Sequence, residues 1–122
     1  MKIVRFSDAK KQIHYGIQTG DRIEEIDGDI LSNWKPSNRK HNASDVDLLA
    51  PINPTQLVCI GLNYHDHAKE AGFKIPAEPL IFLKGINSTA GNNDNIVLPR
   101  VAPEQVDFEA ELLIVISKNA KC

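Results

Sequence analysis

The segment VDFEAELLIVI, residues 106–116, begins with three carboxylates and continues as an unbroken aliphatic run. With the two-residue period of a β-strand, Asp107, Glu109 and Glu111 share one face, which becomes aliphatic further along. The other face is apolar throughout. The pattern predicts a buried strand that carries carboxylates into the protein interior at its start.

Carboxylates on one strand face crowd one another. Consecutive ones stand about 6.5 Å apart at their Cα atoms, from a rise of ~3.3 Å per residue. In a low-dielectric interior such groups repel as anions or take up protons. A hard divalent cation resolves the conflict, because Mg²⁺, Mn²⁺ and Ca²⁺ prefer carboxylate oxygens. The alternative is a strand whose first residues emerge into solvent, and the pattern alone leaves both possibilities open.

Composition places the 122-residue chain among ordinary globular proteins of about one domain, with 42% hydrophobic and 25% charged residues. Fourteen Lys and Arg against sixteen Asp and Glu give a net charge of −2, without the clustered basic face that nucleic-acid binding needs. No apolar run approaches the ~18 residues of a membrane span, and no signal peptide is recognisable, which favours the cytoplasm. Cys59 and Cys122 are expected to be free thiols, since their spacing suggests no disulfide framework.

The first third of the chain, residues 1–47, reads as a small β-domain with a linker. KIVRF (2–6) and QIHYGI (12–17) are strand candidates. The pair Asp27–Gly28 lies between apolar-bearing runs and predicts a hairpin turn. Residues 32–47 are polar and rich in turn formers, so we expect a linker or an exposed connection there.

Residues 56–84 predict a strand, a helix and a second strand. QLVCIGL (56–62) and PLIFLK (79–84) have the apolar character of buried strands. Between them lies a helical pattern over residues 63–72. Asn63 is the expected N-cap, and Gly72 stands where a glycine ends a helix.

Two side chains of this helix are candidates for acid–base chemistry. His67 and Glu70 are i, i+3 neighbours on one helix face. A carboxylate beside an imidazole fixes its tautomer and raises its basicity, which makes a general base for neutral pH. The alternative is a polar surface helix with incidental histidines. His65 does not share a helix face with His67, so an H-x-H metal pair is not expected.

Several motifs in this order resemble those of the fumarylacetoacetate hydrolase superfamily. They are VCIGLNYHDHAKEAG (58–72), EPLIFLKG (78–85), IVLP (96–99) and VDFEAELLIVI (106–116). The N-terminal residues are similar to the small β-domain that precedes the catalytic body in many members. The resemblance implies an α+β, mostly β fold, in which residues 48–122 form the start of a mixed β-sandwich roll.

The resemblance also implies an activity. Members similar to this chain include 2-hydroxyhepta-2,4-diene-1,7-dioate isomerases and acylpyruvate hydrolases. They are metal-dependent enzymes that act on small 2-oxo or 1,3-dicarbonyl acids by C–C hydrolysis, isomerisation or decarboxylation, and they usually form homodimers. We therefore expect such an acid as substrate, a homodimer as assembly, and no nucleic-acid or membrane partner.

The family's functional positions fall on six residues of this sequence. They are Glu109 and Glu111 for the metal, His67 and Glu70 for catalysis on a mobile lid helix, and Lys84 and Tyr64 for substrate binding. The expected metal is Mg²⁺ or Mn²⁺, with Ca²⁺ as a further possibility.

One departure from the family concerns the third metal carboxylate, an aspartate on a later strand that has no counterpart up to residue 122. Two carboxylates hold Mg²⁺ weakly. The sequence therefore predicts the N-terminal portion of a longer enzyme, with little activity of its own. The alternative is a non-catalytic β-rich module that associates with another chain through an unpaired sheet edge.

Overall fold

The computed structural model describes residues 1–119 and 121. The chain folds into two compact units, one of residues 1–51 and 90–122 and one of residues 52–89. Among the described residues, more belong to strands than to helices, which confirms the prediction of an α+β, mostly β chain. No helix in the described part of the chain is both long enough and apolar enough to cross a membrane.

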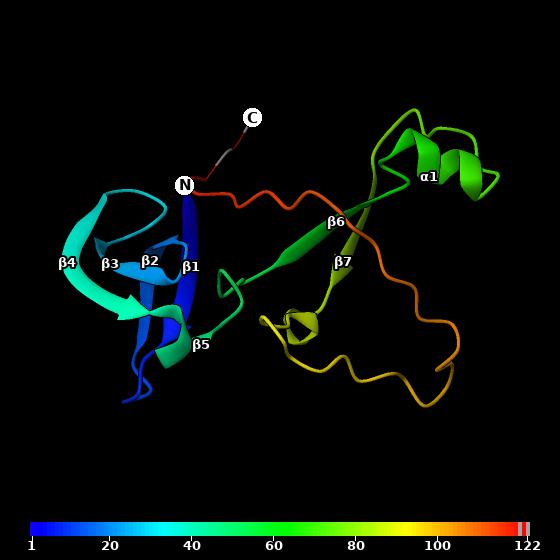
Figure 1. The fold of residues 1–122 in the computed structure, drawn as a ribbon. Coiled ribbons are helices and arrows are strands. Elements are labelled where there is room, and N and C mark those ends of the chain that lie inside the picture. Colours follow the sequence, from blue (N-terminus) through cyan, green and yellow to red (C-terminus); the bar gives the residue numbers. More distant parts are fainter. Residues whose placement is uncertain (120, 122) are drawn as a thin grey trace. The chain divides into compact units, whose positions relative to one another are not determined.

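The first unit is built on a five-stranded antiparallel sheet with the strand order β4-β3-β2-β1-β5 (Figure 1). The predicted strands 2–6 and 12–17 are both present, as β1 and β2. The elements are β1 (Lys2–Ser7), β2 (Ile13–Thr19), β3 (Arg22–Gly28), β4 (Trp34–Asn42), η1 (Ala43–Asp45) and β5 (Asp47–Leu48).

The tight turn of this sheet lies at Gly20–Asp21, because Thr19 pairs directly with Arg22 and leaves a two-residue loop between β2 and β3. Gly20 has a φ of +57°, a conformation that glycine adopts without steric cost. The predicted turn at Asp27–Gly28 was wrong: both residues belong to β3. The loop that follows, residues 29–33, is held by the Asp29 side chain, which accepts a hydrogen bond from the Leu31 amide at 2.9 Å.

The predicted linker at residues 32–47 was also wrong, because most of it forms the nine-residue strand β4. β4 pairs with β3 from Arg22↔Asn42 to Gly28↔Trp34. Its sequence is polar because it is an edge strand with largely exposed side chains, so it lacks the apolar alternation of a central strand. Pro36 is compatible with this position, since an edge strand has a row of backbone groups that need no partner.

The core of the first unit lies on the concave inner face of the sheet. Phe6 and Ile23 are fully buried, and Val4 packs with them. The partly buried side chains against this cluster are Ala43, Val46 and Leu48, which follow the last long strand. The short η1–β5 segment therefore closes the open end of the sheet over Phe6.

We expect Gly16→Ala to destabilise the first unit by about 1–3 kcal/mol, the usual cost of overpacking a core. A Cβ at Gly16 would overlap the buried Ile23 Cγ2 atom and lie 2.9 Å from the Glu24 carbonyl oxygen. Gly20→Asn is the control, because Asn tolerates positive φ and a Cβ at Gly20 meets nothing within 4 Å. Urea unfolding followed by the fluorescence of Trp34, the only tryptophan, measures both. An unchanged midpoint for Gly16→Ala would contradict the packing described here.

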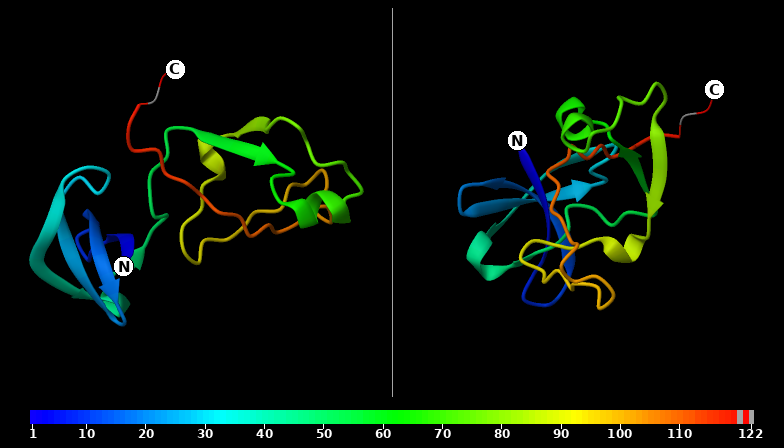
Figure 2. Two further views of the ribbon diagram at one scale, coloured as in Figure 1. Left: turned by 90° about the horizontal axis from the view of Figure 1, so that it is seen from above. Right: turned by 90° about the vertical axis from the view of Figure 1, so that its right-hand side faces the viewer.

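The second unit consists of a two-stranded antiparallel ribbon, one helix and a 3₁₀ turn (Figure 2). The predicted strands at 56–62 and 79–84 are confirmed. The elements are β6 (Leu57–Gly61), α1 (His65–Glu70), β7 (Leu80–Lys84) and η2 (Ile86–Ser88). Every residue of β7 is exposed, including Ile81 and Leu83, which are 67% and 63% exposed. The ribbon therefore presents apolar side chains to solvent.

Helix α1 ends as the sequence predicts and begins differently. Gly72 has a φ of +71° and donates its amide to the Lys69 carbonyl, and the Phe73 amide reaches the Ala68 carbonyl at 2.9 Å. These two bonds form a Schellman motif, which satisfies the last carbonyls of the helix. The N-cap is Tyr64, whose side chain makes no capping hydrogen bond, so the prediction of Asn63 as N-cap was wrong.

The stretch from residue 90 to residue 119 contains no helix or strand (Figure 1). The predicted strand at 106–116 is therefore wrong for this structure. Its apolar side chains are exposed, with Phe108 at 98% and Leu112 at 80%. A strand exists only when a neighbouring strand accepts its hydrogen bonds, and here the alternating pattern has no such neighbour among the described residues.

Candidate active site

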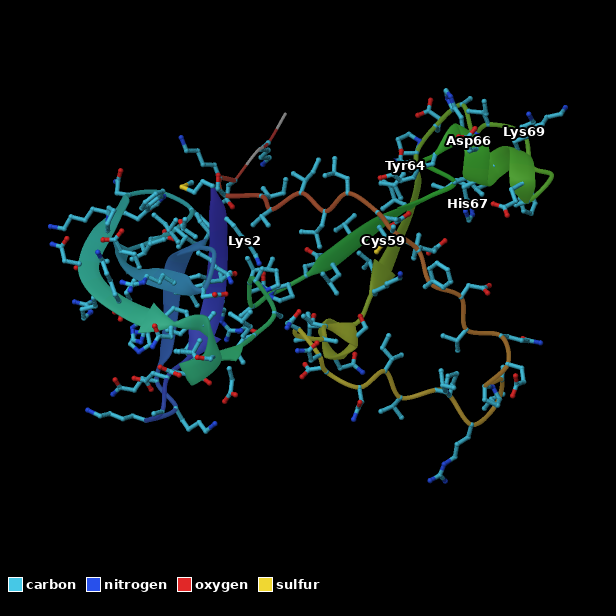
Figure 3. All side chains as sticks on the ribbon, in the orientation of Figure 1. Lys2, Cys59, Tyr64, Asp66, His67 and Lys69 are labelled. Atoms are coloured by element: carbon cyan, nitrogen blue, oxygen red, sulfur yellow. The ribbon has the colours of Figure 1, made fainter. Side chains whose placement is uncertain are left out.

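The predicted catalytic pair lies on α1. His67 and Glu70 are both exposed and stand three positions apart, so they share one face of the helix. Figure 3 shows His67 and Asp66 on different sides of α1, as the 100° step per residue requires. The i, i+3 spacing therefore allows the His67 imidazole and the Glu70 carboxylate to lie side by side on the helix surface.

The helix follows β6 almost directly. Gly61 ends the strand, and Leu62 has a φ of +51°, an uncommon value for a branched apolar residue. This left-handed residue turns the chain from the strand into the helix within three residues. Tyr64, 42% exposed, stands at the helix start next to the turn (Figure 3).

Lys84 lies at the other end of the ribbon from α1. It pairs with Leu57, whereas Gly61, next to the helix, pairs with Leu80 (Figure 1). Four residues separate these positions, which is about 13 Å along a strand at ~3.3 Å per residue. The Lys84 ammonium lies 5.8 Å from the centre of the Phe82 ring on the same strand. The structure does not bring Lys84 together with His67.

The two predicted metal ligands, Glu109 and Glu111, are exposed side chains on the irregular 106–116 segment. Their carboxylate oxygens have the chemistry that a hard divalent cation prefers. Within residues 1–119 and 121, however, no three His, Cys, Asp or Glu side chains are grouped closely enough to hold a metal ion. The two carboxylates thus have suitable chemistry for such an ion, but the described residues do not form a complete metal site around them.

The two cysteines were expected to be free thiols. Cys59 is free and half-buried in β6. Cys122 lies outside the described residues.

Sequence reasoning missed a cluster of ionisable groups on the inner face of the first unit. The Glu25 side chain is 6% exposed and lies between cationic or ionisable partners from two other strands. Arg39 donates to it through Nε at 2.8 Å and Nη2 at 2.6 Å, His41 Nε2 lies 3.0 Å away, and His14 Nδ1 lies 3.2 Å away. The signal was present in RIEEIDG, where Glu25 falls on the same strand face as the buried Ile23.

These contacts change the ionisation of Glu25. Its pKa is lowered from 4.5 to about 2, mainly because Arg39 donates hydrogen bonds to the carboxylate. Burial opposes this shift, and His41 and His14 add smaller contributions that lower the pKa further. Hydrogen bonds to the Glu25 carboxylate and then to the Asp27 carboxylate raise the pKa of the Arg39 guanidinium above its usual value. Phe6 packs beside the cluster, with ring centroids 5.5 Å from His14 and 5.0 Å from His41. Glu25 thus joins β2, β3 and β4 at a single carboxylate.

Comparisons with known proteins name the family of the chain. Residues 56–122, more than half of the chain, match the family model "Fumarylacetoacetate (FAA) hydrolase C-terminal". Residues 1–51 match the model "Rv2993c-like, N-terminal". The chain belongs to the fumarylacetoacetate hydrolase family, which confirms the resemblance seen in the sequence.

Curated relatives of the chain include enzymes. A fumarylacetoacetate hydrolase domain-containing protein 2 homolog of Dictyostelium discoideum is 46% identical over 85 residues, 70% of this chain and 28% of that protein. The mitochondrial oxaloacetate tautomerase FAHD2A of Homo sapiens is 47% identical over 79 residues, 64% of this chain and 25% of that enzyme. The chain thus spans about a quarter of the length of these two relatives.

Solved structures share the fold. A crystal structure of Cg1458 with inhibitor matches 84% of this chain and 41% of its own, with a TM-score of 0.67 and 29% identity. A 5-carboxymethyl-2-hydroxymuconate delta-isomerase from Mycobacterium smegmatis matches 74% of this chain and 35% of its own, with a TM-score of 0.61 and 26% identity. The relatives whose names state an activity are therefore enzymes that act on small acids.

Proposed function

We propose that the chain contributes the acid–base helix and two metal ligands of an enzyme that acts on a small 2-oxo or 1,3-dicarbonyl acid. The reaction would be a tautomerisation, isomerisation, decarboxylation or C–C hydrolysis that passes through an enolate. One observation carries the proposal: His67 and Glu70 share a face of the helix that directly follows β6, inside the segment that matches the family. The names of the relatives favour oxaloacetate as the first substrate to test.

In this proposal His67 moves the proton and Glu70 holds the imidazole in the tautomer that the transfer needs. A general base of this kind contributes typically 10²–10⁴-fold to a rate. Tyr64, at the start of the same helix, contacts the substrate. The Lys84 ammonium pairs with the substrate carboxylate and with the negative charge that develops on the enolate oxygen.

The separation of Lys84 from α1 makes closure of the helix a necessary part of the proposal. Lys84 and the helix lie at opposite ends of the ribbon, so α1 has to move for both to contact one small acid. The turn at Leu62 is the natural hinge, because a branched residue at positive φ is strained and its free energy falls when it leaves that conformation. Closure would also exclude bulk water from the proton transfer.

We further propose that Glu109 and Glu111 bind Mg²⁺ or Mn²⁺. The ion would supply Lewis-acid stabilisation of the enolate. Added Mn²⁺ is expected to broaden the amide NMR signals of residues 107–113 selectively, since the ion is paramagnetic and the two carboxylates are its nearest ligands. Glu109→Gln with Glu111→Gln should abolish this broadening, whereas Glu104→Gln, an exposed carboxylate on the same segment, should leave it unchanged. Equal broadening in all three proteins would contradict the assignment.

A chimeric enzyme tests the catalytic proposal independently of how much chain surrounds the site. The 79 residues of the human oxaloacetate tautomerase that align with this chain would be replaced by the residues of this chain. We expect the folded chimera to tautomerise oxaloacetate, measured by the loss of enol absorbance. A chimera that folds and assembles but lacks activity would argue against this chain as the carrier of acid–base groups.

A second function is favoured by one observation: every residue of β7 is exposed. A ribbon with apolar side chains in solvent suits association with another chain, and a homodimer is the assembly we propose. Light scattering after size exclusion reports the mass. A dimer without turnover in the chimera would favour an association module, and a monomer would remove the support for this function.

A further inference from the structure

A pocket in the first unit lies outside the proposed catalytic residues. It has a volume of about 320 Å³ and is lined by residues at the β3–β4 end of the sheet, namely Arg22, Lys40, His41, Asn42 and Asp45. This volume is at the lower end of the range for small-molecule sites. Arg22 and Asn42 are direct cross-strand partners, so the pocket is formed by the paired ends of two strands and the turn that follows.

The two long cations of this pocket have no ion-pair partner among the described residues. No salt bridge or side-chain hydrogen bond joins Arg22 or Lys40 to another side chain in that part of the chain. Two other cations of the same unit are engaged: Arg39 binds Glu25 and Asp27, and Lys11 binds Asp47 at 2.8 Å. Arg22 and Lys40 therefore offer the pocket two cationic groups that are not engaged by a carboxylate of the described residues.

Two carboxylates, Glu24 and Asp45, lie near these cations. Glu24 is the cross-strand partner of Lys40, but the two form no ion pair. Asp45 accepts hydrogen bonds from the Asn42 side-chain amide at 2.8 Å and from the Ser44 hydroxyl at 2.9 Å, which lower its pKa and hold its charge in place. Asp45 is thus held by neutral donors, which leaves the Arg22 guanidinium and the Lys40 ammonium available to a ligand.

His41 belongs to the pocket lining, but its imidazole is engaged elsewhere. Its Nε2 atom lies 3.0 Å from the buried Glu25 carboxylate, and its ring is packed against Phe6. Because successive residues of a strand point to opposite faces, this ring lies on the opposite face of β4 from Lys40 and Asn42. We therefore expect the contacts to a ligand to come from Arg22 and Lys40.

We propose that this pocket binds a small dianion through a carboxylate or phosphate group. The guanidinium of Arg22 offers paired N–H donors that match either group, and Lys40 adds a point charge. The inference is independent of the catalytic proposal, because none of the pocket residues belongs to it. It assigns a ligand site to the N-terminal unit, apart from the acid–base helix.

Titration of the ¹⁵N-labelled 122-residue chain at low ionic strength tests the proposal, with malonate and inorganic phosphate as separate probes and sodium chloride as a matched-strength control. We expect saturable shifts confined to the amides of residues 22–24 and 40–45. Arg22→Gln with Lys40→Gln should weaken binding at least about tenfold, as the loss of two charge-assisted contacts implies. Arg22→Lys with Lys40→Arg should retain it.

Lys2→Gln with Lys10→Gln provides the matched control, since it removes the same charge from exposed positions outside the pocket. A response to malonate alone identifies a dicarboxylate, and a response to phosphate alone identifies a phosphate ligand. Shifts that do not saturate, that chloride reproduces, or that the control variant reduces equally would overturn the proposal. All three double variants change exposed side chains only, and amide dispersion verifies that they fold.

Discussion

Replacement of Glu25 by glutamine is expected to lower the free energy of unfolding of the first unit by about 3 kcal/mol. This is the lower end of the cost of removing one partner from a buried ion pair. The carboxylate is 6% exposed and holds Arg39, His41 and His14, so its loss removes one charged acceptor from all three partners. Arg39 keeps Asp27, and His14 keeps Asp8. Arg39 is 56% exposed, which lets water replace part of what it loses. Urea unfolding followed by Trp34 fluorescence measures the change.

Asp27→Asn is the matched control, because Asp27 is the second partner of Arg39 but its side chain is 44% exposed. We expect a cost below about 1 kcal/mol, as for surface ion pairs. Equal losses of unfolding free energy in the two variants would contradict this prediction, because they would show that burial of Glu25 does not strengthen its contribution to stability.

The same carboxylate predicts a pH dependence with a definite sign. The pKa of Glu25 is about 2 in the fold and ordinarily 4.5, so the folded state holds the ionised form. Its contribution to stability is complete above about pH 4.5 and is lost as the pH falls toward 2. The difference in unfolding free energy between wild type and Glu25→Gln should therefore shrink over this window. A constant difference from pH 5 to pH 2.5 would contradict the assignment.

His67→Ala in the chimera with the human oxaloacetate tautomerase is expected to reduce kcat by 10²–10⁴-fold, the usual contribution of a positioned general base. Glu70→Gln should have a smaller effect on kcat, because it disturbs the orientation of the imidazole and leaves the proton carrier in place. His65→Ala is the control, since His65 lies on the same helix but not on the face that His67 and Glu70 share. A loss below about threefold for His67→Ala would remove the base from the proposal.

Sequence reasoning worked where local periodicity decides structure. β1, β2, β6 and β7 follow runs of alternating or continuous apolar residues, and the glycine that ends α1 needs only its own backbone freedom. It failed where the outcome depends on a partner. The sequence of β4 is polar and predicts a linker, because its pairing with β3 depends on tertiary structure and leaves no apolar pattern in β4 itself.

The opposite failure occurred at residues 106–116, whose pattern is a strong strand signal without a neighbouring strand in the described residues. The candidate site divides in the same way. The spacing of His67 and Glu70 is a local property of a helix, so the sequence could place them together. Whether Glu109 and Glu111 meet a third ligand depends on tertiary structure, which no local pattern encodes.

The composition of β4 also governs how the first sheet behaves at high concentration. β4 is an edge strand with Pro36 near its start, Lys35 beside it, and Arg39 and Lys40 further on, while the opposite edge, β5, is only two residues long. Proline interrupts the row of amide donors, and lysine and arginine repel an identical strand. Neither edge can therefore template the stacking of further copies into a fibril, and the N-terminal sheet should remain dispersed at concentrations where a bare edge would polymerise.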